Sequence, residues 1–354
     1  SCALVGPEGE LFCWGGNPCG ALGTEADDYA EVHTPIVPFP PAWSAAPTML
    51  AGGRTNIPEA SFCVVGDGEG TFCWGCSEKG SLGTGTSSTT NASPAPLQVE
   101  EEVLWLGSDE GTLCAGLGDG QVKCWGAQPW PTNSETDAPG GPGKYYPELA
   151  DATGLSISML HACAIDPYGD VYCMGDNGFG GIGLPDDLVY DAPVWIDELS
   201  NIVGLAPAAT GTFAWSSTGD LFVWGTTHCS SFGIGVVEQW FIPVTQVPLP
   251  APVTKVVATE ASACALSSDG AVYCWGGNGY GEAGEPTLSQ VHLPSLVALP
   301  TQIVDLAAGA YHLLALDVDG TVWAWGDNEL GQLGRGKLVP PDGPVVVLPP
   351  PGAN

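Results

Sequence analysis

One short phrase recurs seven times along this chain at nearly constant spacing. At 274–285 it reads CWGGNGYGEAGE, and at 173–184 it reads CMGDNGFGGIGL. After a first interval of 60 residues, successive copies lie 49 to 51 residues apart. The copies are marked by Trp14, Trp74, Trp125, Met174, Trp224, Trp275 and Trp325. A period of about fifty indicates one supersecondary unit that is repeated seven times.

Each unit contains the pattern of four short strands. Around Cys264 the sequence CALSSDGAVYCWG places two apolar stretches on either side of a tight turn at 268–270. TKVVATE at 254–260 predicts a strand before this hairpin, and PSLVALP at 294–300 predicts one after it. Seven such units around an axis would bury both faces of every sheet. We therefore expect an all-β fold, a seven-bladed β-propeller of four-stranded antiparallel blades, as a single domain over 1–354.

The first blade is expected to lack its innermost strand. The chain opens with SCALVGPEGELFCWGG, in the middle of a repeat, so we interpret this start as a processed or truncated end. Two explanations stay open. Flanking residues of a precursor supply the strand, or another polypeptide donates it to the open sheet edge and the protein is an assembly subunit.

Two stretches carry a family resemblance. ACALSSDGAVYCWGGNGYGEAG at 263–284 and YHLLALDVDGTVWAWGDNELGQLG at 311–334 resemble the regulator of chromosome condensation repeat. The resemblance implies a seven-bladed propeller, but it does not imply nucleotide exchange, because the family is functionally diverse. It also includes propellers that inhibit bacterial β-lactamases. The third unit, with AQPWPTNSETDAPGGPGKYY, departs most from the pattern.

Ten of the 13 cysteines form pairs that bracket a hairpin turn, at separations of ten or, in the first pair, eleven residues. Folding the hairpin sets the two cysteines of each pair opposite one another, at a distance that suits a disulfide. Zinc ligation is disfavoured, because two cysteines per blade leave a metal with two ligands and because apolar pairs replace them in units five and seven. The expected disulfides are Cys2–Cys13, Cys63–Cys73, Cys114–Cys124, Cys163–Cys173 and Cys264–Cys274.

Three cysteines remain. Cys19 and Cys76 lie in corresponding loops of neighbouring blades, and the sequence leaves open whether they form an inter-blade bridge. Cys229 has no evident mate, so it is either buried and inert or joined to another chain. Five hairpin disulfides imply an oxidising compartment, hence secretion or the cell surface.

The charge balance excludes one class of partner. Forty acidic residues against seven Lys and Arg give a formal charge of −33, which repels phosphate backbones and argues against nucleic-acid binding. The acidity is interpreted as a solvated coat, with a basic partner or multivalent cations as alternatives. The sequence contains no apolar run of eighteen residues, the length that would predict a membrane span.

We find no catalytic pattern in the sequence. His161 and His312 share one repeat position, which favours a structural hydrogen bond. His33, His228 and His292 lie in connecting loops without a Ser/Asp or Cys partner at a recognisable spacing. No metal or cofactor site is predicted, and an enzyme with convergent groups in the central channel is a disfavoured reading.

A variable position lies five residues after each repeat tryptophan, or after Met174. Variation at a fixed point of a repeat indicates an exposed ring of contacts, although these side chains could instead fill gaps between blades. The predicted partner contacts are Trp130, Phe179, Tyr280 and Leu330, with Trp43, Tyr145 and Tyr146 in Pro/Gly-rich loops. The sequence thus predicts an extracellular, non-enzymatic binding or structural module for a protein partner or for self-assembly. A secreted enzyme inhibitor is the alternative.

Overall fold

The chain folds into short antiparallel strands almost throughout. The computed structural model describes residues 1–5, 10–23, 30–35, 47–52, 60–66, 70–77, 80–85, 88, 90–109, 111–126, 141–158, 160–208, 210–227, 231–285, 288–335 and 343–347. Within these ranges it contains two 3-10 turns, Pro18–Gly20 and Pro147–Leu149, and no α-helix.

The strands group into seven sheets, which we number 1 to 7 in chain order. Sheet 1 contains β1 (Cys2–Val5), β2 (Glu10–Gly15) and β3 (Ala30–Pro35), and sheet 2 contains β4 (Pro47–Gly52), β5 (Ser61–Gly66), β6 (Gly70–Cys76) and β7 (Thr90–Pro96). Sheet 3 contains β8 (Val103–Asp109), β9 (Thr112–Leu117), β10 (Val122–Gly126) and β11 (Lys144–Tyr145), sheet 4 contains β12 (Gly154–Ile157), β13 (His161–Ile165), β14 (Val171–Asp176) and β15 (Val189–Trp195), and sheet 5 contains β16 (Ile202–Ala208), β17 (Gly211–Ser216), β18 (Leu221–Thr227) and β19 (Gln239–Val247). Sheet 6 contains β20 (Val253–Ala258), β21 (Ser262–Ser267), β22 (Val272–Gly277) and β23 (Gln290–Leu296), and sheet 7 contains β24 (Ile303–Ala308), β25 (His312–Asp317), β26 (Val322–Gly326) and β27 (Val345–Val346).

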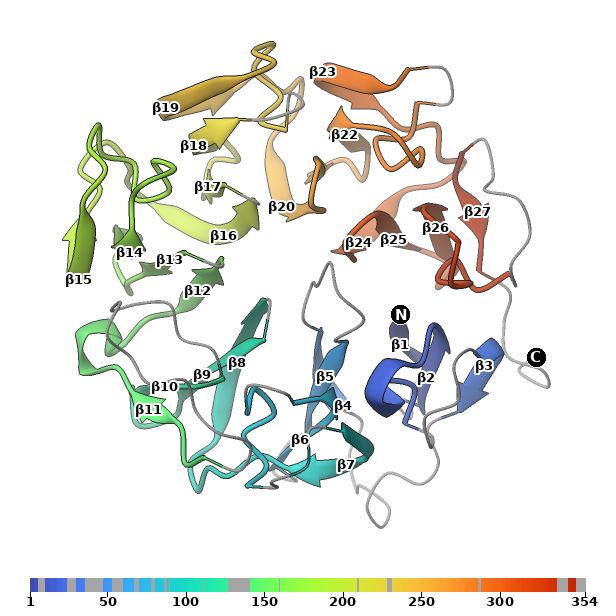
Figure 1. Ribbon diagram of the computed structural model, residues 1–354. Helices are drawn as coiled ribbons and strands as arrows, with labels where there is room; N and C mark the ends of the chain where they lie inside the picture. Colours follow the sequence, from blue (N-terminus) through green and yellow to red (C-terminus); the bar gives the residue numbers. More distant parts are fainter. Residues whose placement is uncertain are drawn as a thin grey trace.

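The sheets are arranged around a ring, with the first strand of each four-stranded sheet towards the axis and the last at the rim (Figure 1). The fold is thus an all-β propeller with four-stranded antiparallel blades. Six sheets have four strands, so the expectation of seven such blades is wrong in its count. Sheet 1 has three described strands, in the order β1-β2-β3. Its β1 pairs with β2 as β5 pairs with β6, and the described residues include no counterpart of β4.

Each hairpin sets one cysteine or apolar pair opposite one another in its register. Cys264 is the partner of Cys274 across β21 and β22, and the two form a disulfide with 4.1 Å between their Cα atoms. Four other sheets contain the corresponding disulfide; Phe213 and Val223 meet at this register in sheet 5. An apolar pair fills the position as well as a disulfide does, which marks the cysteines as part of the scaffold.

One further disulfide joins two sheets. Cys19, in the turn after β2, is bonded to Cys76 at the end of β6, with 5.0 Å between their Cα atoms. The bridge that the sequence left open is therefore present. Cys229 lies outside the described residues.

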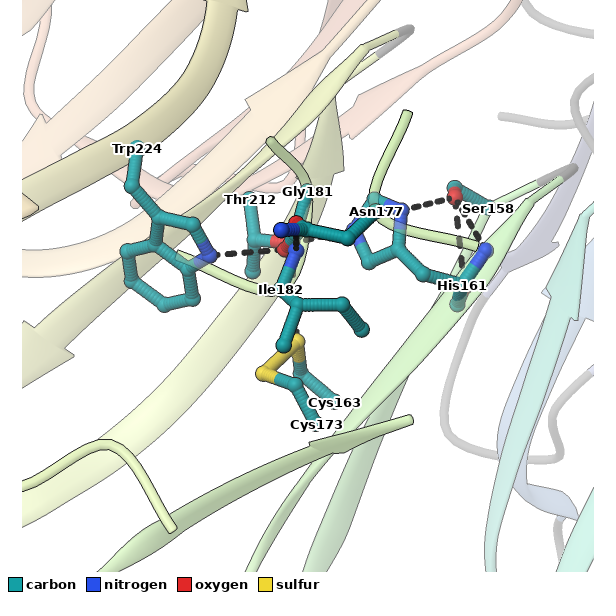
Figure 2. Close-up of a disulfide and its surroundings, with 9 residues drawn as sticks. All are labelled: Ser158, His161, Cys163, Cys173, Asn177, Gly181, Ile182, Thr212 and Trp224. Carbon is teal, nitrogen blue, oxygen red and sulfur yellow. Dashed lines mark hydrogen bonds between the residues drawn. A yellow bond between two sulfur atoms is a disulfide. The ribbon is translucent and has the colours of Figure 1, made fainter. Parts of the chain in front are cut away.

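Five of the six repeat tryptophans link their sheet to the one before it by a hydrogen bond. Trp224 is fully buried, and its indole N–H donates to the carbonyl of Gly181 in sheet 4 at 2.8 Å (Figure 2). A buried N–H needs such an acceptor, because leaving it unpaired costs about 1–3 kcal/mol. In the other sheets with this bond the donor–acceptor pairs are Trp14–Gln332, Trp74–Ala21, Trp275–Ser231 and Trp325–Glu282.

The pair Trp14–Gln332 closes the ring, because it links sheet 1 to sheet 7 across 318 residues of sequence. Trp125 is the exception. Its buried Nε1 has no hydrogen-bond partner among the described residues.

The two kinds of disulfide should differ in their contribution to stability. In the chain-entropy account, a loop closed at a separation of 10 residues contributes about 2–3 kcal/mol, and one closed at 57 contributes about 4 kcal/mol. We therefore expect the pair Cys19→Ala/Cys76→Ala to lower the free energy of unfolding more than Cys264→Ala/Cys274→Ala. Urea denaturation of both variants, with thiol mass spectrometry as the control for pairing, measures the difference. The reverse order would contradict the loop-length argument.

Candidate protein-interaction site

An asparagine organises the loop that follows the repeat tryptophan. In sheet 4, Asn177 stands three residues after Met174, and its Oδ1 accepts a hydrogen bond from the backbone N–H of Ile182 at 3.0 Å (Figure 2). Its Nδ2 donates to the carbonyl of Leu184 at 2.9 Å. The same acceptor bond, from the residue five positions on, is made by Asn17, Asn278 and Asn328. The loop backbone is therefore held from inside.

The variable position of this loop contacts the following sheet. The ring of Phe179 stacks on that of Trp240 in sheet 5, with 6.4 Å between the ring centroids. Tyr280 meets Tyr311 of sheet 7 at 5.3 Å, and Cys19 is bonded to Cys76 of sheet 2.

Leu330 reaches sheet 1 in the same way, since a Cβ built on Gly16 would lie 3.1 Å from its Cδ1. The side chains at this position thus fill the junctions between sheets.

Filling a junction leaves part of each side chain in solvent. Tyr280 is 44% exposed and Leu330 is 40% exposed, while Phe179 is half-buried. Exposed aromatic and aliphatic groups on a fixed backbone are suited to anchoring a protein partner. The side chains at this position pack between sheets and also remain partly exposed. The two interpretations of the sequence, exposed contacts and gap fillers, are therefore compatible.

The other predicted contacts are scattered. Trp130 and Trp43 lie outside the described residues. Tyr145 is exposed at the rim, in β11, and the ammonium of Lys123 lies 4.9 Å from the centroid of its ring. Tyr146 is 1% exposed and packs in the core of sheet 3, so its burial removes it from the surface.

The sequence did not single out Trp240, which is the most exposed tryptophan among the described residues, at 74%. It lies near the start of β19, a rim strand, where the repeat has no fixed motif. Its backbone is nevertheless positioned, because the Thr226 hydroxyl lies 2.8 Å from the Phe179 carbonyl oxygen and 2.5 Å from that of Trp240, and its ring stacks on Phe179. The only signal in the sequence is the aromatic pair WF at 240–241.

Acidic groups surround the Tyr280–Tyr311 contact. Glu282 is 2% exposed, and its Oε2 accepts from the backbone N–H of Tyr280 at 2.8 Å. Burial raises the pKa of this carboxyl above its usual value. Burial, followed by the charge of Glu260, likewise raises the pKa of the Tyr311 phenol. The junction therefore places a buried carboxyl next to an aromatic contact.

The two histidines of the repeat bridge neighbouring sheets. In His161 the Nδ1 lies 2.8 Å from the Ser158 hydroxyl, and the Nε2 lies 2.8 Å from the hydroxyl of Thr212 in sheet 5 (Figure 2). His312 repeats the contact, with its Nε2 2.8 Å from the Ser1 hydroxyl of sheet 1. Burial lowers the pKa of His161 to about 4 and that of His312 to about 3. Both rings are neutral at pH 7 and serve as inter-sheet hydrogen-bond partners.

Within the described ranges, no group of three His, Cys, Asp or Glu side chains is placed to hold a metal ion. Across the same ranges, no helix has the length and apolar character that crossing a membrane requires.

Sequence comparisons match these repeats to known proteins. Two models of the regulator of chromosome condensation (RCC1) repeat match the chain, one at 253–282 and 303–332 and the other at 269–316 and 319–353. The chain therefore carries RCC1 repeats within residues 253–353. It is 25% identical over 289 residues to the ultraviolet-B receptor UVR8 of Arabidopsis thaliana, a match that covers 78% of this chain and 63% of the receptor. A second match, also 25% identical, is the guanine nucleotide exchange factor SRM1 of Saccharomyces cerevisiae, covering 78% of this chain and 54% of that protein.

Solved structures agree on the fold. The crystal structure of Prp20p from Saccharomyces cerevisiae, described together with its binding to Gsp1p and histones, superposes with a TM-score of 0.83 at 20% identity. That match covers 98% of this chain and 88% of Prp20p. Human WBSCR16 superposes with a TM-score of 0.77 at 18% identity, covering 96% and 94% of the two chains. At these identities the likeness establishes the β-propeller fold alone and leaves the partner to be argued from this chain.

The buried histidines should make stability depend on pH. The unfolded His161 ring takes up a proton near pH 6.5, whereas the folded one does so only near pH 4, so acidification between these values favours unfolding. We expect the advantage of the natural protein over His161→Gln to shrink by about 3 kcal/mol between pH 7.5 and pH 4.5. Urea denaturation at the two pH values measures it, with the exposed His292→Gln as the matched control. An advantage that does not change with pH would show that His161 is protonated in the folded state.

Proposed function

We propose that this RCC1-repeat protein is an extracellular, non-enzymatic binding module that presents its junction loops to a protein partner. The observation that carries the proposal is a set of partly exposed side chains on a backbone that is fixed from within. Phe179, Tyr280 and Leu330 each lean on the next sheet and keep an accessible face. A surface that is already ordered loses little conformational entropy on binding, which favours affinity.

The extracellular setting is supported by the cysteine chemistry. The six disulfides of the described residues would be unusual in a reducing compartment. Five of them join the two strands of a single hairpin, at a position that an apolar residue pair can also fill. Sheet 1 would act as the seventh blade, because it is fastened to sheet 7 by Trp14 and to sheet 2 by Cys19. Such a closed ring is a stable platform outside the cell.

Protein partners are the coarse expectation for this family, and the chemistry of the loops agrees with it. Tyrosine and other aromatic side chains contribute most to protein interfaces, and they dominate two of the junctions. The formal charge of −33 favours a partner with a basic surface.

Alanine substitution tests the proposal. We expect Tyr280→Ala and Leu330→Ala each to weaken capture of the partner from the source's extracellular medium by about fivefold to thirtyfold, the range of an interface anchor. Each should lower the melting temperature only slightly. Val304→Ala, which removes an exposed side chain of β24, is the matched control and should leave capture unchanged.

Two results would overturn the proposal. One is a lower melting temperature with unchanged capture, which would make the junction side chains packing elements alone. The other is mass growth of the purified chain by itself in light scattering at low and high salt, which would make it a self-assembling structural protein.

A further inference from the structure

A cavity of about 310 Å³ opens at the rim between sheets 4 and 5. This volume is at the lower end of the roughly 300–1,000 Å³ of small-molecule sites, so it suits a single side chain better than a large ligand. The residues that line it are Gly178, Gly180, Pro185, Asp186, Asp187, Trp240 and Phe241.

One wall of the cavity is aromatic and preorganised. The indole of Trp240 lies against Phe179 at an interplanar angle of 21°, yet the residue is 74% exposed, so its other face is open. Phe241 packs against the backbone of Gly180, where a Cβ would lie 2.8 Å from its Cδ2 and where φ is +69°. Only glycine fits this point without strain, so the wall is built into the loop.

The opposite wall is acidic. The carboxylate of Asp186 is fixed within the loop, accepting hydrogen bonds from the Tyr190 hydroxyl at 2.8 Å and from the Leu188 backbone N–H at 3.1 Å. Asp187 beside it is exposed and makes no hydrogen bond or ion pair with another described residue. The cavity thus carries a fixed charge and a second charge that is available to a ligand.

The described part of the chain supplies no cation to this cavity, since its lining contains no Lys or Arg. Elsewhere the chain places its own lysines on aromatic rings: the Nζ of Lys123 lies 4.9 Å from the ring of Tyr145, and the Nζ of Lys144 lies 4.9 Å from that of Tyr146. Lys255 is paired with Asp305. The cavity likewise combines an aromatic ring with carboxylates, but its lining residues include no cation.

We propose that this pocket receives an arginine side chain of a protein partner, stacked on Trp240 and paired with Asp187. This specifies the chemistry of the partner and rests on the proposed function. A guanidinium is planar, so it stacks on an indole while its N–H groups bond to a carboxylate, which an ammonium does less well. An apolar side chain would leave the carboxylates unpaired, and an anion would be repelled by them.

The test uses the whole chain and three synthetic peptides, acetyl-Gly-Gly-Xaa-Gly-Gly-amide with Xaa as arginine, lysine or citrulline. Citrulline keeps the shape of arginine and removes its charge. Titration by ligand-observed NMR should rank arginine above lysine, and both above citrulline by at least about tenfold. Trp240→Ala and Asp187→Asn should each weaken arginine-peptide binding by about twofold to thirtyfold, the range of a cation–π contact or a partly exposed ion pair.

Matched controls separate the pocket from the general acidity of the surface. Trp195→Ala removes another exposed tryptophan, on β15, and Asp197→Asn removes an exposed carboxylate that does not line the cavity. Both should bind the arginine peptide as the natural chain does. Equal binding by all four variants would overturn the proposal in favour of diffuse attraction. Equal binding of the citrulline peptide would overturn it by showing that the charge of arginine makes no contribution.

The pocket and the proposed function can fail separately. If Trp240→Ala/Asp187→Asn captures the extracellular partner as well as the natural chain does, the pocket proposal falls and the binding module stands. If the arginine peptide binds at the pocket but the natural chain captures no partner, the pocket stands as an arginine site and the proposed function falls. The melting temperature of each variant shows that it is folded.

Discussion

The hydrogen bond that five of the six repeat tryptophans donate to the preceding sheet is the constraint on which the ring depends. The acceptor carbonyl always stands seven residues after the tryptophan of the preceding repeat, or after Met174, as Gly181 does for Trp224 and Glu282 for Trp325. The first and seventh repeats, for example, are each a donor towards one neighbour and, through the loop, an acceptor towards the other. Because the N–H is buried, the loop must hold its carbonyl in one place, and the internal asparagine does this.

This constraint explains which parts of the repeat vary. The first interval between repeats is 60 residues, and the distance from Trp14 to its acceptor-bearing Ala21 is still seven. The fourth repeat changes the donor itself: Met174 occupies the buried position without an N–H. The preceding third repeat is the one whose sequence after the tryptophan departs most from the pattern. The repeat without an indole donor thus follows the repeat whose loop sequence is least like the others.

Most of the scaffold could be predicted from the sequence because it follows from local spacing. A separation of ten residues around a hairpin turn sets Cys163 opposite Cys173, and the spacing of the tryptophans gives the ring of sheets. The contacts between sheets were harder, because they join residues about fifty or more positions apart with no shared motif. Trp240 was missed for this reason, since nothing in its own strand indicates that Phe179 lies beneath it. Tyr146 was misplaced because a Pro/Gly-rich context predicts a loop, whereas its ring belongs to the core of sheet 3.

The contacts of the variable position explain why its residue type differs from repeat to repeat. Cysteine meets cysteine at Cys19, phenylalanine meets tryptophan at Phe179, and tyrosine meets tyrosine at Tyr280. Each choice matches one side chain of the following sheet, so variation along the ring reflects pairwise packing at each junction. The same pairing decides what remains in solvent, because a ring that leans on its neighbour turns its other face outward. A junction can therefore change its surface chemistry only by changing two residues on different sheets, and this ties the binding surface of the propeller to its stability.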